Sequence, residues 1–168
     1  MRSPFLPAIA LLLAALLAGC GFQMRGTADL PFHTLYMPPV SGGIGLDVKR
    51  NIQAGTNTKL VDDPKMADAQ LQITTEARGR NILSLAATGR VREYQLQYTV
   101  GFRVHDGKGG EFVPANSITL TRDITFNDSD VLSKEAEEGQ LYRDMQFDMV
   151  QQIMRRLAAA KPARPAVQ

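Results

Sequence analysis

The sequence has few of the residues that build disulfides and metal clusters: one cysteine, Cys20, and two histidines, His33 and His105, among 168 residues. A single cysteine excludes a disulfide within the chain and a zinc site made of several cysteines. The sequence also lacks a large excess of charge of either sign, because it has 19 Lys and Arg and 17 Asp and Glu. This balance argues against a nucleic-acid-binding protein that neutralises phosphates. With 44% hydrophobic residues the composition is that of one folded domain.

One uncharged apolar run is present, from Phe5 to Leu17, after a basic start at Arg2. It is shorter than the roughly 20 residues that a membrane-spanning helix needs. A basic start, a short apolar run and small residues form a secretory signal peptide, so residues 1–19 are predicted to be cleaved.

The cysteine comes directly after this run, in Leu17-Ala18-Gly19-Cys20. The order resembles a bacterial lipobox, in which the thiol receives a diacylglyceryl group and the chain is cut before the cysteine. The alternative is a buried free cysteine beside an ordinary cleavage site. Several acyl chains anchor a protein stably, whereas one does so only marginally. Gly21, in place of Asp, favours sorting to the outer membrane.

The remaining chain predicts an α+β domain over residues 20–160 and a flexible tail over 161–168. Apolar residues alternate with polar ones from Tyr94 to Val104, as in an antiparallel strand with one wet face. A turn at 105–110 and a returning strand over 112–126 follow, with a bulge or an edge position at Arg122. Apolar residues at helical spacing predict helices over 43–53, with Ser41 as the cap, and from Val131 to about Ala160. We expect a two-layer sandwich: about four mostly antiparallel strands with two helices on one face.

No catalytic constellation is found, so no enzyme and no cofactor or metal are expected. His33 falls in an extended arm and His105 in a turn, with no neighbouring motif to orient either as a base. The glycines at 107–110 lack the Lys-Ser/Thr pair of a phosphate-binding loop and predict a turn. Phe147 and Met154, off the main stripe of the last helix, either rim the core or contact a partner.

Basic residues provide the candidate binding sites. Arg78, Arg80, Arg90 and Arg92 flank residues 81–89, the expected turn between two strands. They predict guanidinium groups at one end of the sheet, either as a solvated hairpin tip that discourages edge pairing or as a site for an anionic ligand such as a phosphorylated glycolipid. Lys134 lies among acids and reads as a paired surface lysine. The wet face with Gln95, Gln97 and Thr99 is polar and uncharged, which suits solvent or the lumen of a polar barrel.

Several segments together resemble the LptE (RlpB) family of lipopolysaccharide-assembly lipoproteins, over about residues 20–157. The first is Cys20-Gly21-Phe22-Gln23-Met24-Arg25-Gly26. The second is Thr88-Gly89 followed by Glu93-Tyr94-Gln95-Leu96, which looks like the central strand of the family. The third comprises Arg122, Phe126-Asn127-Asp128 and Leu132-Ser133-Lys134, which resemble the approach to the last helix of the family.

The resemblance implies a lipoprotein on the periplasmic side of the outer membrane that plugs the β-barrel protein LptD, assists its assembly, and with it moves lipopolysaccharide to the cell surface. It also implies a four-stranded sheet with two helices. Lys134 matches a family lysine implicated in lipopolysaccharide contact. A basic residue that the family has before its central strand corresponds here to Ala87, and Arg90 and Arg92 lie beyond the turn instead. The alternative function is an outer-membrane lipoprotein that activates or tethers a cell-wall synthase.

Overall fold

The structure, a computed structural model, describes residues 29–126, 130–161 and 164–165. A mixed sheet has the strand order β2-β1-β3-β4-β5-β6. The strands are β1 (Thr34–Tyr36), β2 (Lys59–Val61), β3 (Ala69–Leu85), β4 (Val91–His105), β5 (Gly110–Thr125) and β6 (Arg164–Pro165). The helices are α2 (Gly43–Gly55), the short 3₁₀ helix η1 (Pro64–Met66) and α3 (Val131–Ala158).

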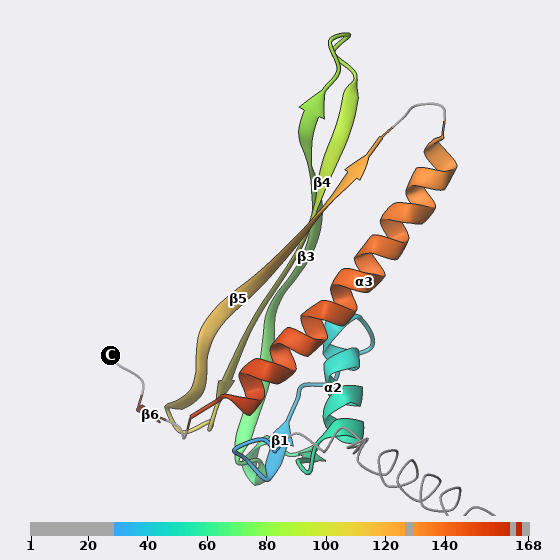
Figure 1. Cartoon of the computed structure of the whole chain (residues 1–168). Helices are drawn as coiled ribbons and strands as arrows, with labels where there is room; N and C mark the ends of the chain where they lie inside the picture. The colour runs from blue at the N-terminus through green and yellow to red at the C-terminus, as the bar shows by residue number, and fades with distance from the viewer. Residues whose placement is uncertain (1–28, 127–129, 162–163, 166–168) are drawn as a thin grey trace, which may run out of the picture.

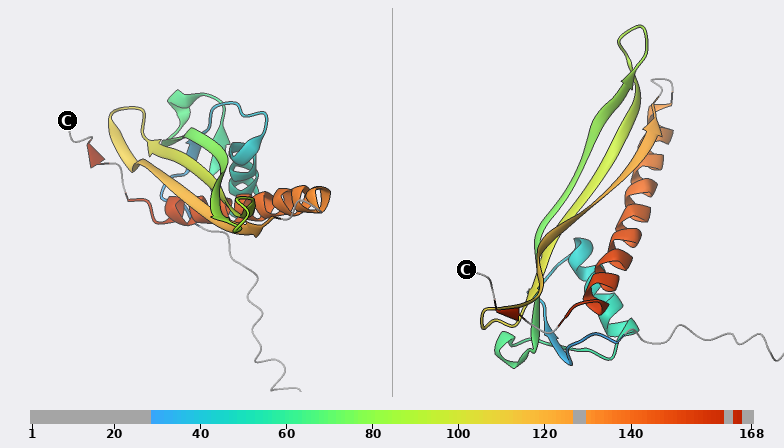
Figure 2. Two further views of the ribbon diagram at one scale, coloured as in Figure 1. Left: turned by 90° about the horizontal axis from the view of Figure 1, so that it is seen from above. Right: turned by 60° about the vertical axis from the view of Figure 1, so that its left-hand side comes forward.

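The three long strands form an antiparallel meander, which confirms the expected α+β fold. The sheet has more strands than expected, because β1 adds to β3 in parallel and β2 adds to β1. Figures 1 and 2 show a long, narrow, twisted sheet, with α3 running along one face and α2 beside the lower half of α3. No helix in the described part of the chain is long and apolar enough to cross a bilayer.

The core lies between the lower part of the sheet and the two helices. Alternation along β4 puts every second residue on the helix-facing side, and these are fully buried: Leu96, Tyr98, Val100, Phe102 and Val104. The helices contribute the expected stripes, all buried: Ile44, Val48 and Ile52 from α2, and Tyr142, Met145, Met149, Val150, Ile153 and Leu157 from α3. The helical and strand periods that predict these elements therefore also select the core.

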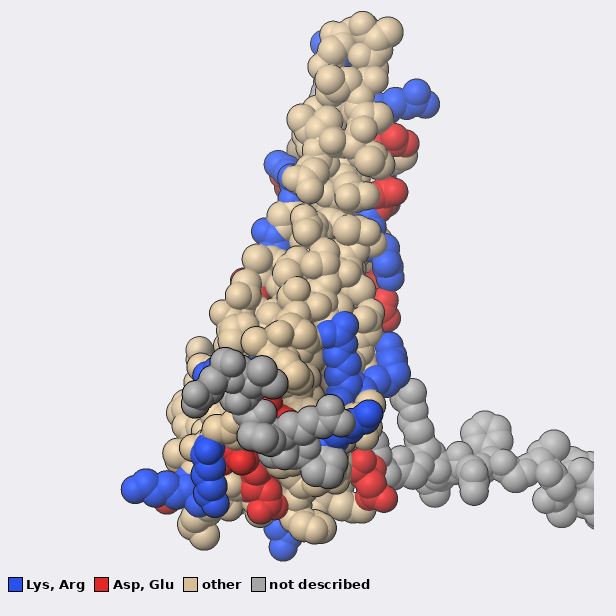
Figure 3. Space-filling model, turned by 90° about the vertical axis from the view of Figure 1, so that its left-hand side faces the viewer, with Lys and Arg blue, Asp and Glu red and all other residues tan. Residues whose placement is uncertain are grey.

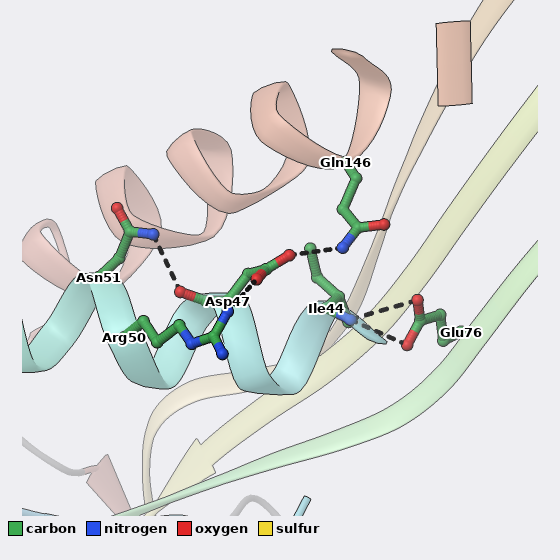
Figure 4. Close-up of polar contacts among 6 residues, drawn as sticks. All are labelled: Ile44, Asp47, Arg50, Asn51, Glu76 and Gln146. Atoms are coloured by element: carbon green, nitrogen blue, oxygen red, sulfur yellow. Dashed lines mark hydrogen bonds and ion pairs between the residues drawn. The ribbon is translucent and has the colours of Figure 1, made fainter. Parts of the chain in front are cut away.

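The start of α2 differs from the expectation, because Ser41 does not cap the helix. Gly42 occupies the cap position without a side-chain hydrogen bond. The backbone N–H of Ile44 donates instead to the Glu76 carboxylate on β3, at 3.2 and 3.3 Å (Figure 4). On the next turn, the amide of Gln146 on α3 donates to the Asp47 carboxylate. A helix end needs partners for its first N–H groups, and here a residue far away in sequence supplies one.

One local expectation needs correction, and two others can be compared with the structure. Strand β3 continues through Leu85, so the tight turn spans Ala86 to Arg90 rather than residues 81–89, and the Gly89 N–H donates to the Ala86 carbonyl at 2.9 Å. Arg122 pairs in register with Leu96; it has an edge position without a bulge, and the irregularities of the β4–β5 pair lie at its other end, between Phe102 and His105. Within the expected tail, Arg164 and Pro165 pair with Glu111 and Gly110.

Candidate functional site

A pocket forms where the upper parts of β4 and β5 meet the first turns of α3. Its volume is about 130 Å³. This is below the roughly 300–1,000 Å³ of sites that enclose a drug-sized ligand, so it suits a small group such as a phosphate. It is lined by Arg80, Tyr94, Ile124, Phe126, Val131, Lys134, Glu135 and Glu138. We call it the upper pocket. Two basic residues singled out from the sequence, Arg80 and Lys134, thus share one cavity.

Lys134 occupies the first turn of α3 and points across to β5. Its side chain is 20% exposed, and its ammonium donates to the Thr125 hydroxyl at 3.2 Å and to the Glu137 carboxylate at 2.8 Å. The expected pairing with a surface acid is therefore present. Exposed ion pairs contribute only about 0–1 kcal/mol, so an anionic ligand can replace Glu137 at low cost.

Arg80 approaches the upper pocket from the edge of β3. Its guanidinium carbon lies 5.0 Å from the centre of the Tyr94 ring, and its Nη1 lies 3.4 Å from a Glu138 carboxylate oxygen. Tyr94 in turn packs edge-on against Phe126, with ring centres 5.4 Å apart. A cation on an aromatic face keeps its position while its hydrogen-bonding edge stays available.

Arg78 has a different environment, because it lies between two tyrosines. Its guanidinium carbon is 5.0 Å from the Tyr98 ring centre and 5.3 Å from the Tyr142 ring centre, and it donates to Gln146 on α3 at 2.5 Å. Burial and the neighbouring Glu76 raise the pKa of the Tyr98 hydroxyl, so it remains a donor to that carboxylate. Burial likewise raises the pKa of Tyr142. Arg78 thus joins the sheet to α3.

The other two arginines lie at the end of the long hairpin. Arg90 ends the tight turn, and its carbonyl accepts from the Ala86 N–H at 2.8 Å; Arg92 is the second residue of β4. Of the four arginines expected at one end of the sheet, Arg90 and Arg92 thus lie at the turn, whereas Arg78 and Arg80 lie further along β3, opposite Tyr98 and Leu96. The long strands separate the two pairs.

Both histidines lie in local hydrogen bonds of the backbone. The backbone N–H of His33 donates to the Asp68 carboxylate, and the His105 Nδ1 accepts from the Gly107 backbone N–H in the predicted turn. Among the residues that the structure describes, no three His, Cys, Asp or Glu side chains come together in a way that could hold a metal ion. Cys20 and the predicted signal peptide lie outside the described residues.

The aromatic part of the upper pocket does not follow from the sequence reasoning. The alternation places Tyr94 and Phe126 in the core-facing phase of their strands, which is correct. The register of β4 and β5, with Glu93 opposite Thr125, brings the two rings together above the last buried layer. The sequence signal that could have indicated this pocket is a basic residue and an aromatic residue in the core-facing phase, near the ends of neighbouring strands.

The face of the sheet turned away from α3 carries small, uncharged side chains. Three neighbouring rows across the strands are Ala77–Thr99–Thr119, Gly79–Gln97–Thr121 and Thr75–Gly101–Ser117. We call these nine residues the outer face. The Thr99 and Thr119 hydroxyls are 2.9 Å apart. Figure 3 shows this side of the molecule, where uncharged residues form a continuous band and the charged ones lie mainly along its margins and towards the base.

Comparison with known proteins identifies relatives over nearly the whole described chain. The model of a family described as LptE, lipopolysaccharide-assembly, matches residues 32–157. The LPS-assembly lipoprotein LptE of Pectobacterium atrosepticum is 29% identical over 145 residues, which cover 83% of this chain and 77% of that protein. The solution structure of lipoprotein B from Nitrosomonas europaea has a TM-score of 0.71 and 41% identity, covering 83% of this chain and 91% of that one. Rare lipoprotein B from Shewanella oneidensis has a TM-score of 0.64 and 28% identity, covering 75% and 92%.

Proposed function

Because the chain belongs to the LptE lipopolysaccharide-assembly family, we propose that it is an outer-membrane lipoprotein, acylated at Cys20, that plugs the LptD β-barrel and assists its assembly. Together the two proteins move lipopolysaccharide to the outer leaflet. The role is one of binding, without catalysis. The family match across residues 32–157 is the observation that carries this proposal.

The outer face supports the role of a plug. Small uncharged side chains such as Thr99 and Thr119 present hydroxyls without a charge that a partner would have to neutralise. A polar surface without ionic groups has a low desolvation cost when it packs against a polar barrel wall. The elongated sheet in Figure 2 presents this face along its length.

The upper pocket supports contact with lipopolysaccharide phosphates. Lys134 and Arg80 offer two cations beside an aromatic floor, and both now pair with acids that a phosphate can displace. Arg90 and Arg92 provide further charge along the hairpin. Arg78 is enclosed by Tyr98 and Tyr142, so we assign it to the attachment of α3 instead.

Purification of the tagged chain from outer membranes tests the barrel partnership. We expect LptD in stoichiometric amount, and depletion of the chain should leave LptD misassembled and the cell surface poor in lipopolysaccharide. Thr99→Glu places a charge on the outer face and should lower the recovery of LptD. Ala136→Glu, at an exposed position of α3, is the matched control. Recovery of a cell-wall synthase without LptD would support the alternative function.

Lipopolysaccharide binding is tested with Lys134→Ala and Arg80→Ala. Each loses one charge-assisted hydrogen bond to phosphate, worth about 1.5–3 kcal/mol, which corresponds to a roughly 10- to 100-fold weaker affinity. Lys108→Ala, in the loop at the opposite end of β4, is the control and should bind as the parent does. Equal affinities for all three variants would contradict the assignment of the upper pocket.

A further inference from the structure

A second pocket lies at the lower end of the sheet, between β1, β3 and β4. Its volume is about 260 Å³. Its lining includes polar side chains from all three strands and one proline: Tyr36, Pro38, Gln70, Gln72, Arg103 and His105. We call it the lower pocket. It is smaller than the roughly 300–1,000 Å³ of sites that enclose a whole drug-sized ligand, so it suits a single side chain.

Arg103 is the basic residue of the lower pocket, and part of its guanidinium is held in place. Its Nε donates to the Gln72 side-chain oxygen at 2.8 Å. Its two Nη groups form no hydrogen bond or ion pair with another residue that the structure describes. A guanidinium fixed through Nε presents its Nη groups as a planar fork, which matches the two oxygens of a carboxylate.

Neutral donors accompany this charge in the lower pocket. The His105 Nδ1 accepts from the Gly107 backbone N–H at 3.1 Å, so the neutral ring carries its proton on Nε2, where it can donate. The amide of Gln72 accepts through its oxygen and keeps its nitrogen as a donor. The Tyr36 hydroxyl provides one more. Such a set of donors selects an anionic group.

The nearby acids do not satisfy Arg103. No Asp or Glu in the described part of the chain lines the lower pocket. Asp106 accepts instead from two backbone N–H groups of the turn, at 2.7 and 2.8 Å, and Glu111 lies opposite His105 on β5, outside the lining. One guanidinium matches the single charge of a carboxylate, whereas a phosphate group with about 1.5 to 2 negative charges would remain partly unneutralised.

The position of the lower pocket connects it to the outer face. Arg103 and His105 continue the β4 phase of Thr99 and Gly101, so their side chains lie on the same side of the sheet as the outer face. The outer face has no charged side chain among its nine residues. A neutral polar surface does not by itself fix the register of a partner, and a charge pair at one end of the contact does.

We propose that the lower pocket receives the carboxylate of an Asp or Glu side chain from the inner wall of the barrel partner, bound by the two Nη groups of Arg103. The ion pair fixes the position of the outer face along the barrel wall. This inference rests on the proposed function, because it assigns a contact with the same partner. It separates two sites on the chain: a protein carboxylate in the lower pocket and lipid phosphates in the upper pocket.

A photo-crosslink in the full chain, purified with its partner from outer membranes, identifies what occupies the lower pocket. The crosslinking amino acid p-benzoylphenylalanine replaces Tyr36, which lines the pocket, and no charge changes. We expect a crosslinked LptD peptide in which an Asp or Glu neighbours the point of attachment. The same amino acid in place of Phe147, on the exposed side of α3, is the control and should attach elsewhere. Attachment of the Tyr36 reporter to lipopolysaccharide, or to an LptD segment without an acid, would overturn the inference.

Charge reversal tests the ion pair itself. Arg103→Glu should lower the recovery of LptD with the tagged chain about 10- to 100-fold, through the loss of a charge-assisted pair. Lys108→Glu makes the same change in net charge on the nearby turn, outside the lower pocket, and should recover LptD as the parent does. Replacing the crosslinked LptD acid by Arg should restore the recovery with Arg103→Glu, which a purely structural role of Arg103 would not allow.

The outcomes distinguish this inference from the proposed function. If the parent chain recovers no LptD, the proposed function is wrong and the inference is wrong with it. If the parent recovers LptD and Arg103→Glu recovers as much as Lys108→Glu, the inference alone is wrong. A loss with Arg103→Glu that the reversed LptD acid does not restore would also overturn it.

Discussion

At the scale of the residue, Asp68 holds the start of β1 through its carboxylate. It accepts from the Thr34 N–H at 2.9 Å and the His33 N–H at 3.0 Å, while its own N–H donates to the Thr34 hydroxyl at 2.8 Å. The Thr34 backbone bond is the largest influence that lowers the pKa of this carboxyl from 3.8.

The pKa of the Asp68 carboxyl is lower in the folded chain than in the unfolded chain. The ionised carboxylate therefore stabilises the fold at pH values above the unfolded-state pKa, and this stabilisation is lost as the pH falls through the folded-state pKa. Urea unfolding at neutral pH and at about pH 3 should therefore show a smaller acid-induced loss of stability in Asp68→Asn than in the parent. Glu135→Gln, an exposed carboxylate on α3, is the control and should retain the parental loss. An unchanged pH dependence in Asp68→Asn would show that another group is responsible.

Gly43 is the residue that allows Glu76 to approach the start of α2. Its φ is +66°, and a Cβ there would lie 2.5 Å from a Glu76 carboxylate oxygen. Gly43→Ala should therefore lower the free energy of unfolding by about 1–3 kcal/mol, through left-handed strain and the loss of the cap. At Gly42 the backbone is extended and a Cβ would meet nothing within 4 Å. Gly42→Ala is the matched control, and equal losses in urea unfolding would rule out this role for Gly43.

At the scale of the element, α3 has a buried face whose side chains stabilise the fold and an exposed face whose side chains do not. Met149 is fully buried, whereas Phe147, two residues away, is 65% exposed. Met149→Ala should destabilise the protein by about 2–5 kcal/mol because it leaves a cavity. Phe147→Ala should change stability by less than about 0.5 kcal/mol. Thermal unfolding of both variants checks this, and a large loss from Phe147→Ala would mean that the ring is covered in solution.

The elements that can be predicted from the sequence are those with many periods of one pattern. The sequence of β4 alternates from Tyr94 to Val104 and α3 repeats its stripe through several turns, so the pattern locates and orients both correctly. Strands β1 and β2 have three residues each, too few for a pattern to show that they pair in parallel. Their pairing depends on contacts formed only in the folded chain.

For the candidate site, the sequence predicts which individual residues take part but not which of them lie together. Residue type identifies Lys134 and the arginines, but the pairing of Arg80 with Glu138 spans 58 residues and that of Arg78 with Gln146 spans 68. Such contacts depend on how α3 packs on the sheet, which local spacing does not encode. Sequence reasoning therefore has no means of separating Arg78, between its tyrosines, from the arginines at the hairpin end.

At the scale of the whole molecule, buried contacts are concentrated at one end. No residue from Gln72 to Gln95 is buried, while Leu96 to Val104 on β4 alternate through the core. In Figure 1 the hairpin continues past the helices that cover the rest of the sheet. A β-hairpin on its own is only marginally stable in water, so the upper part of β3 and β4 should open without unfolding the lower part.

Amide hydrogen exchange of the free protein measures this gradient. We expect amides of residues 82–94 to exchange through local opening at free energies well below the global value, and those of Leu96, Tyr98 and Phe102 to exchange only on global unfolding. The Ile124 amide on β5 should be intermediate, since its side chain is 5% exposed but its strand has no further neighbour at that position in the described residues. Met149→Ala should accelerate the core amides and leave the hairpin unchanged, because local opening does not break core contacts. Uniform acceleration would instead mean that the sheet unfolds as one unit, and that the exposed hairpin derives its stability from the core below it.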